Sequence, residues 1–317
     1  MPIALLALTL SAFAIGTTEF VIVGLLPTIA TSLVPKDKAA SAIAIMFTGL
    51  TVALVTGVPL GTFIGQHAGW RETFLAVSAL GLVAFVGSLL YVPSNIQHGK
   101  PASLLQQVQV LGQPRLLLVY AMTAVGYGGS FIAFTYLAPI LQQVSGFSAG
   151  AVGAVMLVYG VSVAFGNIWG GKLADKKGPV SALKRIFLLL ALVLLLLTFT
   201  APHPVLVVIT VLLWGAVAFG NVAGLQVYVV RQAEHFTPRA VDVASGLNIA
   251  AFNLGIAGGA WGGGLIVEHL GLVHTGWIGA LVVLGAFGLT ALSGRLDRLN
   301  PIPVRTGGEQ SMQAVGH

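Results

Sequence analysis

The chain has 317 residues, of which 56% are hydrophobic and only 8% are charged. Because an ordinary soluble domain has roughly a quarter of its residues charged, this composition excludes a water-soluble globule and an intrinsically disordered chain. The net charge is +6, but the basic residues lie singly or in short clusters between apolar runs, so nucleic-acid binding is not favoured. The absence of cysteine excludes disulfides, thiolate metal sites and a cysteine nucleophile.

The apolar stretches are long enough to cross a bilayer as helices, since about 20 apolar residues span its hydrocarbon core. Nine such stretches cover residues 3–30, 40–66, 72–93, 114–142, 149–171, 186–201, 204–230, 241–267 and 274–294. The first has no basic residue ahead of it and no convincing cleavage site, so it is predicted to be a retained helix. The predicted fold is an all-α membrane protein with about nine transmembrane helices.

The positions of Lys and Arg predict how the chain is oriented, because basic loops remain in the cytoplasm. Alternate connections hold 14 and 1 of the 15 basic residues. This bias predicts a cytoplasmic C-terminus and, with nine spans, an N-terminus on the outer side. The expected location is the cell inner (plasma) membrane, which the chain crosses several times.

One connection, residues 94–113, is polar, Gln-rich and long enough to link two domains. It predicts a truncated N-terminal bundle of three spans (1–93), a cytoplasmic linker (94–113), a C-terminal six-helix bundle (114–294) and a cytoplasmic tail (295–317). A weak repeat crosses the linker, with Gly49, Gly61 and Gly65 recurring as Gly246, Gly258 and Gly262. Internal duplication and chance both explain it, and close helix packing is the simplest role for these glycines.

Five segments carry a family resemblance: LALTLSAFAIGTTEFVIVGLLPTIA (6–30), MFTGLTVALVTGVPLGTFIG (46–65), GWRETF (69–74), GGKLADKKG (170–178) and LNIAAFNLGIAGGAWGGG (247–264). They resemble the drug and sugar efflux proton antiporters of the major facilitator superfamily, in particular the arabinose-efflux-permease-like members. The resemblance implies a major-facilitator-type helical bundle. It also implies a secondary active transporter, not an enzyme, that exports a small organic molecule in exchange for protons by alternating access.

The sequence departs from this family after Ala30, where TSLVPKDKAAS resembles the loop before the family's fifth helix. Helices two to four are therefore expected to be missing, which leaves an incomplete first half beside a six-helix second half. The loss of an odd number of helices would move the N-terminus across the membrane, in agreement with the charge bias. The alternative function is a transport-inactive remnant, or a subunit that needs a partner chain to complete the cavity.

Glu19 is the only acidic residue in the middle of a predicted span. An ionisable group there is costly and is by default a functional site. We expect it to bind the transported proton, and the resemblance supports this because an embedded acid on the first helix couples protons in some related antiporters. The alternative is a permanently protonated Glu19 that donates a hydrogen bond to a neighbouring carbonyl.

Two further segments have a role implied by the resemblance. The segment 171–178, with Gly171, Asp175, Lys176, Lys177 and Gly178, resembles the family's gating loop, and Asp175 is expected near the start of the following helix. A basic anchor at the cytoplasmic surface is the alternative. In the antiporter-like motif, Gly57, Pro59 and Gly61 are expected to kink the second span and help to seal it against protons; simple packing is the alternative.

Polar and aromatic residues inside the later spans are candidates for the substrate cavity. On the fourth span an aromatic face recurs at helical spacing, and the other candidates are single amides that would otherwise bridge helices. They are Tyr127, Phe131, Phe134, Asn167, Asn221, Gln226, Asn248 and Asn253.

The remaining expectations concern ligands and partners. No cofactor and no metal site are expected, and the G-x-S-x-G match at 146–150 joins two membrane helices, so Ser148 is expected to be a helix N-cap and not a nucleophile. The expected partners are a small-molecule substrate, protons and the lipid bilayer, with no nucleic acid. Assembly of two copies into a homo-oligomer stays open.

Overall fold

The computed structural model describes residues 67–92 and 104–299, together with single positions between 53 and 65. Within these residues, seven helices are long and apolar enough to cross a membrane. They correspond to the last seven predicted stretches. The stretch 3–30 lies outside the described residues and 40–66 is described only at scattered positions, so the total of nine stays a prediction.

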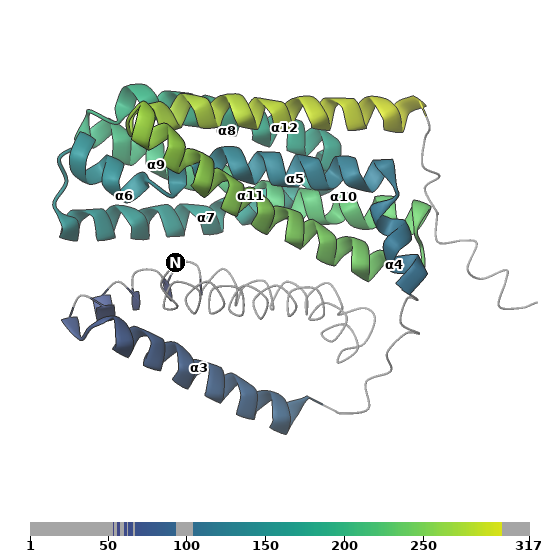
Figure 1. Ribbon diagram of the computed structural model, residues 1–317, viewed down its shortest axis with the longest axis horizontal. Helices are drawn as coiled ribbons and strands as arrows, with labels where there is room; N and C mark the ends of the chain where they lie inside the picture. The colour runs from purple at the N-terminus through teal and green to yellow at the C-terminus, as the bar shows by residue number, and fades with distance from the viewer. Residues whose placement is uncertain are drawn as a thin grey trace, which may run out of the picture.

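The spans that follow the linker form one antiparallel helical bundle (Figure 1). Two of them are interrupted: α5, α6 and a π-helical turn share the span 114–144, and α9 and α10 share the span 204–236. The elements of the bundle are α5 (Pro114–Phe134), α6 (Leu137–Pro139), the π-helical turn (Ile140–Val144), α7 (Ala149–Lys177), α8 (Pro179–Thr200), α9 (Pro204–Ala218), α10 (Asn221–Phe236), α11 (Val241–His269) and α12 (His274–Leu299). Six of the seven candidate spans in the described part of the chain belong to this bundle.

Local sequence explains where several helices begin. Pro114, Pro179 and Pro204 occupy the first positions of α5, α8 and α9, where proline's missing N–H has no intrahelical partner to lose. Ser148 accepts a hydrogen bond from the backbone N–H of Ala151 at 3.3 Å. This confirms its predicted role as an N-cap, which satisfies a free backbone donor at the start of α7.

Two predicted boundaries were wrong. Helix α8 begins at Pro179 and not near residue 186, because it continues through Lys184 and Arg185, whose charges hid its first turns. The stretch 204–230 lies in one span that continues to Phe236, and this span is interrupted at Phe219 and Gly220, between α9 and α10. There the backbone N–H groups of Gly220 and Val222 bond to carbonyls only three residues earlier, which tightens the turn.

Glycine lets α5 approach α11 and α12 closely. A Cβ atom on Gly259 would overlap the carbonyl oxygen of Gly128, and one on Gly129 would lie 2.8 Å from the carbonyl oxygen of Gly279. Small residues of this kind allow membrane helices to pack backbone against backbone. The packing role expected of the repeat glycines was wrong for Gly246, Gly258 and Gly262, because a Cβ on any of them would meet no atom of the described residues within 4 Å. Helix α11 packs through other glycines.

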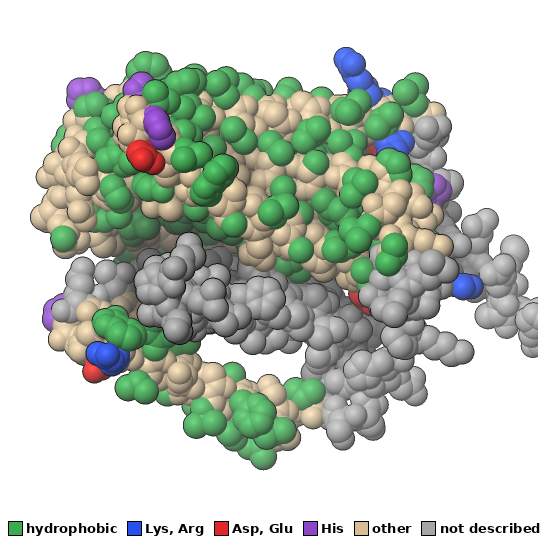
Figure 2. All heavy atoms as spheres, in the orientation of Figure 1, with side chains coloured by type: hydrophobic (Ala, Val, Ile, Leu, Met, Phe, Trp, Pro, Cys, Tyr) green, Lys and Arg blue, Asp and Glu red, His purple; other side chains and the backbone are tan. Residues whose placement is uncertain are grey.

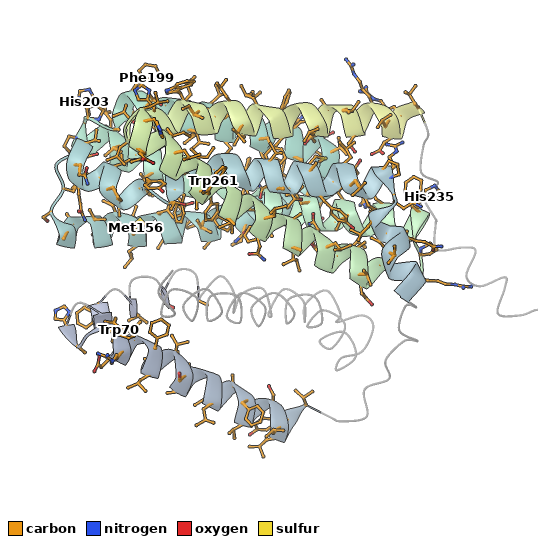
Figure 3. All side chains as sticks on the ribbon, in the orientation of Figure 1. Trp70, Met156, Phe199, His203, His235 and Trp261 are labelled. Atoms are coloured by element: carbon orange, nitrogen blue, oxygen red, sulfur yellow. The ribbon has the colours of Figure 1, made fainter. Side chains whose placement is uncertain are left out.

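The bundle has an apolar interior and an apolar exterior, as a protein in lipid requires. Trp214, Phe187 and Met122 are fully buried, while Leu192, Phe199 and many other large hydrophobic residues are exposed. In Figure 2 these hydrophobic side chains cover the sides of the bundle. Figure 3 places His203 and His235 at its opposite ends, as expected for a span that crosses the membrane between them.

Within the described residues, two helices precede the bundle, α3 (Trp70–Tyr91) and α4 (Leu104–Leu111), and α4 lies within the predicted linker. Helix α3 is long and apolar enough to span a membrane, yet none of its residues is buried. It lies apart from the bundle in Figure 1. Helix α3 therefore has an apolar surface that nothing in the described part of the chain covers.

Candidate functional site

Tyr127 and Asn221 form the centre of the candidate site. The Tyr127 hydroxyl on α5 donates a hydrogen bond of 2.7 Å to Oδ1 of Asn221, the first residue of α10. Tyr127 is 3% exposed and Asn221 is fully buried. Nδ2 of Asn221 makes no hydrogen bond within the described part of the chain, so a buried donor is free at this point. A buried polar group without a partner is costly and calls for an explanation such as a ligand or a water molecule.

A second chain of polar side chains lies one helical turn along α5. The Thr123 hydroxyl donates to Oδ1 of Asn248 at 2.7 Å, and Nδ2 of Asn248 donates to Oε1 of Gln226 at 3.3 Å. Nε2 of Gln226 in turn donates to the hydroxyl of Ser245. These bonds connect α5, α10 and α11. The sequence missed Thr123, although its position four residues before Tyr127 puts it on the same helical face.

The predicted aromatic face of α5 is present and extends onto its neighbours. The ring centroids of Phe131 and Phe134 are 5.2 Å apart, and those of Tyr127 and Phe252 of α11 are 4.1 Å apart. The Phe134 ring also lies 4.9 Å from that of Tyr159 on α7. Edge-to-face and tilted arrangements at these distances stabilise aromatic clusters. The rings therefore join α5, α7 and α11, with Phe131, Phe134 and Phe252 only half-buried.

Two of the predicted cavity residues do not join this cluster by hydrogen bonds. The side chain of Asn253 donates to the carbonyl of Ile249 on its own helix at 3.3 Å. Asn167 is half-buried on α7, and no hydrogen bond connects it to the cluster within the described residues. The structure brings together Tyr127, Phe131, Phe134, Asn221, Gln226 and Asn248 and leaves these two aside.

The segment 171–178 differs from the expectation in one respect. Asp175 does not lie near the start of a helix; it lies in the last turn of α7, and only Gly178, with φ +78°, separates α7 from α8. A carboxylate opposes the helix dipole there, whereas Lys176 and Lys177 complement it. Asp175 is exposed and forms no ion pair with another described residue.

The other predicted site residues can be placed only in part. Glu19 and Pro59 lie outside the described residues. A Cβ on Gly57 would have nothing within 4 Å, and one on Gly61 would be 3.6 Å from Cγ2 of Thr73. The kink and the proton site therefore stay predictions. Among the described residues, no group of three or more His, Asp or Glu side chains could hold a metal ion.

Comparison with known proteins identifies the family. The family model described as the Major Facilitator Superfamily matches residues 2–235. The chain belongs to this superfamily. Its relatives are transporters, so the major-facilitator membership supports membrane transport and not catalysis.

Two curated relatives show how far the similarity extends. The chain is 51% identical over 296 residues to the uncharacterized MFS-type transporter YtbD of Bacillus subtilis (strain 168), a match that covers 93% of this chain and 74% of that protein. It is 37% identical over 273 residues to the inner membrane transport protein YdhP of Escherichia coli (strain K12), which covers 86% of this chain and 69% of that protein. As a superfamily member, the chain is a multi-pass membrane protein.

A solved structure supports the fold. The crystal structure of a bacterial homolog to the human lysosomal transporter Spinster, in an inward-facing and unoccupied conformation, matches with a TM-score of 0.61. The match covers 85% of this chain and 73% of that chain, at 18% sequence identity. At this identity the likeness shows the major-facilitator fold alone.

A further polar cluster, at the end of the bundle where α5 begins, was not predicted from the sequence. Nη1 of Arg115 lies 3.2 Å from Oδ1 of Asp297, whose carboxylate also accepts hydrogen bonds from Tyr228 at 2.6 Å and Gln232 at 3.1 Å. The cluster connects the start of α5, the end of α10 and the end of α12. The sequence offered no signal for it, because Arg115 and Asp297 are 182 positions apart and each looks like an ordinary charge at a helix end.

Proposed function

We propose that the chain is a secondary active transporter that exports a small organic molecule, such as a drug or a sugar, in exchange for protons by alternating access. The observation that carries this proposal is the polar and aromatic cluster around Tyr127 and Asn221, inside the membrane-spanning part of a major-facilitator bundle. Transporters of this superfamily bind substrates near the middle of the bilayer between their two halves. The drug and sugar efflux branch is part of the proposal and rests on the segments quoted above.

In this mechanism the cluster binds the substrate. The free Nδ2 of Asn221 would donate a hydrogen bond to a substrate oxygen, and the half-buried rings of Phe131 and Phe252 would stack on its apolar surface. Charged residues of the described spans lie near helix ends. The proton would therefore bind to Glu19, the acid that the sequence places in the middle of the first span.

Gating would depend on the segment 171–178. Its Gly178 turn joins α7, which carries Tyr159 of the aromatic cluster, to α8. Lys176 and Lys177 would then form interactions that differ between inward-open and outward-open states, with Asp175 as their acidic counterpart. Gly57, Pro59 and Gly61 would shape the second span against proton leak.

The alternative function is a remnant, or a subunit, that transports only with a partner chain or a second copy. The exposed apolar surface of α3 favours it, since none of the residues of α3 is buried. The match to the Bacillus relative covers 93% of this chain and 74% of that protein, so part of the relative is not matched by this chain. A partner would cover the apolar surface of α3 that no described residue covers.

An efflux assay separates the two functions. Proteoliposomes with the purified chain are loaded with candidate drugs and sugars, a pH gradient is imposed, and efflux is compared between the unchanged chain, Glu19→Gln and Asn221→Ala. We expect proton-dependent efflux that Glu19→Gln uncouples from the gradient and that Asn221→Ala weakens. Equal efflux from the unchanged chain and Glu19→Gln would contradict proton coupling through Glu19, and no efflux from any of them would favour the remnant.

A further inference from the structure

The first turns of α8, which the charge bias predicts to be cytoplasmic, carry two basic residues next to an apolar groove. Arg185 is exposed and Lys184 is half-buried, and neither forms an ion pair with another described residue. Arg185 lies three residues before Leu188, so it is about 4.5 Å from Leu188 along the helix axis and close to the same face. Its long side chain can keep its charge at the membrane surface while its methylene groups lie over apolar surface.

The groove below these residues runs between α8 and α12. It has a volume of about 130 Å³ and is lined by Leu188, Ala191, Leu192, Leu195, Trp277 and Leu284, with Ala280 and Leu281 completing it. Leu192 and Leu281 are more than half exposed. In a membrane-spanning bundle, an apolar groove of this kind on the lateral surface of the helices faces lipid and not water.

Close contacts between the two helices fix how the groove and the basic residues are aligned. A Cβ on Gly294 of α12 would lie 2.6 Å from Cγ1 of Val180, and one on Gly279 would lie 3.7 Å from Cδ1 of Leu194. The helices are thus antiparallel, with Val180 level with Gly294. Arg185 lies about 7.5 Å deeper along the axis than Val180, so it is at the cytoplasmic mouth of the groove.

The neighbouring turn adds positive charge at the same membrane surface. Lys172 and Lys184 each lie six residues from Gly178, on two helices that contact each other and run in opposite directions. They are therefore at a similar depth. Lys176 and Lys177 lie beyond them at the end of α7 and are exposed. Asp175 is the one acidic residue within the segment 172–185, so this segment is strongly basic.

We propose that the cytoplasmic part of α8 and the α8–α12 groove form a binding site for an anionic phospholipid. The phosphate of the lipid accepts hydrogen bonds from Arg185 and Lys184, and one acyl chain lies in the groove along Leu188, Leu192 and Leu195. A basic cluster over an apolar groove complements both parts of such a lipid, and the cytoplasmic leaflet supplies anionic headgroups. This proposal is independent of the transported substrate.

The test measures lipid binding to the purified full chain by native mass spectrometry in detergent, with phosphatidylglycerol and phosphatidylcholine of equal chain length as probes. We expect phosphatidylglycerol to remain bound at lower lipid concentration than phosphatidylcholine. The double variant Lys184→Gln/Arg185→Gln should weaken phosphatidylglycerol binding by about tenfold, whereas Arg185→Lys, which keeps the charge, should retain most of it. Equal binding of the two lipids to the unchanged chain would overturn the proposal.

Three controls distinguish this site from general attraction to a basic surface. Arg295→Gln/Arg298→Gln removes the same charge from exposed positions at the end of α12, beyond the groove, and should leave binding nearly unchanged; an equal loss would overturn the proposal. Leu192→Trp should fill the groove and weaken binding, and no effect would exclude an acyl chain there. Displacement of the lipid by inorganic phosphate alone would show a site for a free anion instead of a lipid.

Discussion

The Tyr127 hydroxyl donates a hydrogen bond to Oδ1 of Asn221 at 2.7 Å, and this bond joins α5 to α10 at the bend between α9 and α10. The two residues are 94 positions apart in the chain. The bond orients the amide of Asn221, so that Oδ1 accepts a hydrogen bond and Nδ2 has no partner among the described residues. An arrangement that holds one donor in a fixed direction inside the membrane is suited to recognition of an oxygen atom on a ligand.

The first prediction concerns this bond. Tyr127→Phe should destabilise the protein by about 1–3 kcal/mol, because it leaves the buried Oδ1 of Asn221 without its donor, and it should also reduce substrate binding. Tyr120→Phe is the matched control on the same face of α5, since the Tyr120 hydroxyl has no hydrogen-bond partner in the described part of the chain. Thermal unfolding in detergent measures both variants. An equal loss from Tyr120→Phe would contradict the importance of the Tyr127 bond.

The second prediction concerns the cluster around Asp297. Asp297→Asn should lower stability more than Arg115→Gln, because the carboxylate of Asp297 accepts bonds from Arg115, Tyr228 and Gln232. The side chains of Arg115 and Asp297 are 13% and 24% exposed, so water partly screens the ion pair and its own contribution is about 1 kcal/mol or less. Chemical unfolding of the two variants should show this order, and the reverse order would refute it.

The third prediction compares two adjacent glycines of α11. Gly259→Ala should destabilise the protein by about 1–3 kcal/mol, because its Cβ would overlap the carbonyl oxygen of Gly128 and push α5 away. Gly258→Ala should be neutral or slightly stabilising, since its Cβ would meet no atom of the described residues within 4 Å. The yield of folded protein and its melting temperature in detergent measure the difference. Similar behaviour of the two variants would show that α5 and α11 do not pack as described.

The fourth prediction concerns orientation in the membrane. Because the chain has no cysteine, single cysteines can be introduced and labelled in intact cells with an impermeant maleimide. Cysteines at Pro2 and His203 should be labelled, and cysteines at Gly178 and Gln310 should react only after the cells are opened. Labelling at His203 without labelling at Pro2 would mean that the number of spans before α9 is odd and not the predicted six.

Much of the architecture could be predicted from the sequence, because membrane helices are recognised by the length and hydrophobicity of their apolar stretches. The bounds of α11 and α12 lie close to the predicted 241–267 and 274–294. Where the prediction failed, at the start of α8, charged residues lay within the helix and masked its first turns. At the junction of α9 and α10, a continuous apolar run gave no sign of the interruption at Phe219 and Gly220.

The sequence could predict which candidate site residues share a face of one helix, but not which residues of different helices meet. Helical spacing placed Tyr127, Phe131 and Phe134 on one face of α5, and the rings do lie in contact. Spacing could not show that Asn221 faces Tyr127 or that Asn253 bonds to its own helix. Such pairings depend on how each helix is rotated about its axis, and that rotation is set by packing against its neighbours.

The sequence by itself determined that this chain is a membrane protein, where its apolar spans lie, and which connections carry its positive charges, because hydrophobic length and charge position act locally. Only the tertiary structure decided which of two adjacent glycines touches α5, which amide keeps a free donor, and that apolar residues of α8 and α12 line a common groove. These features depend on contacts between residues far apart in the chain, and a helix turns by about 100° between one residue and the next, so neighbouring side chains meet different surroundings.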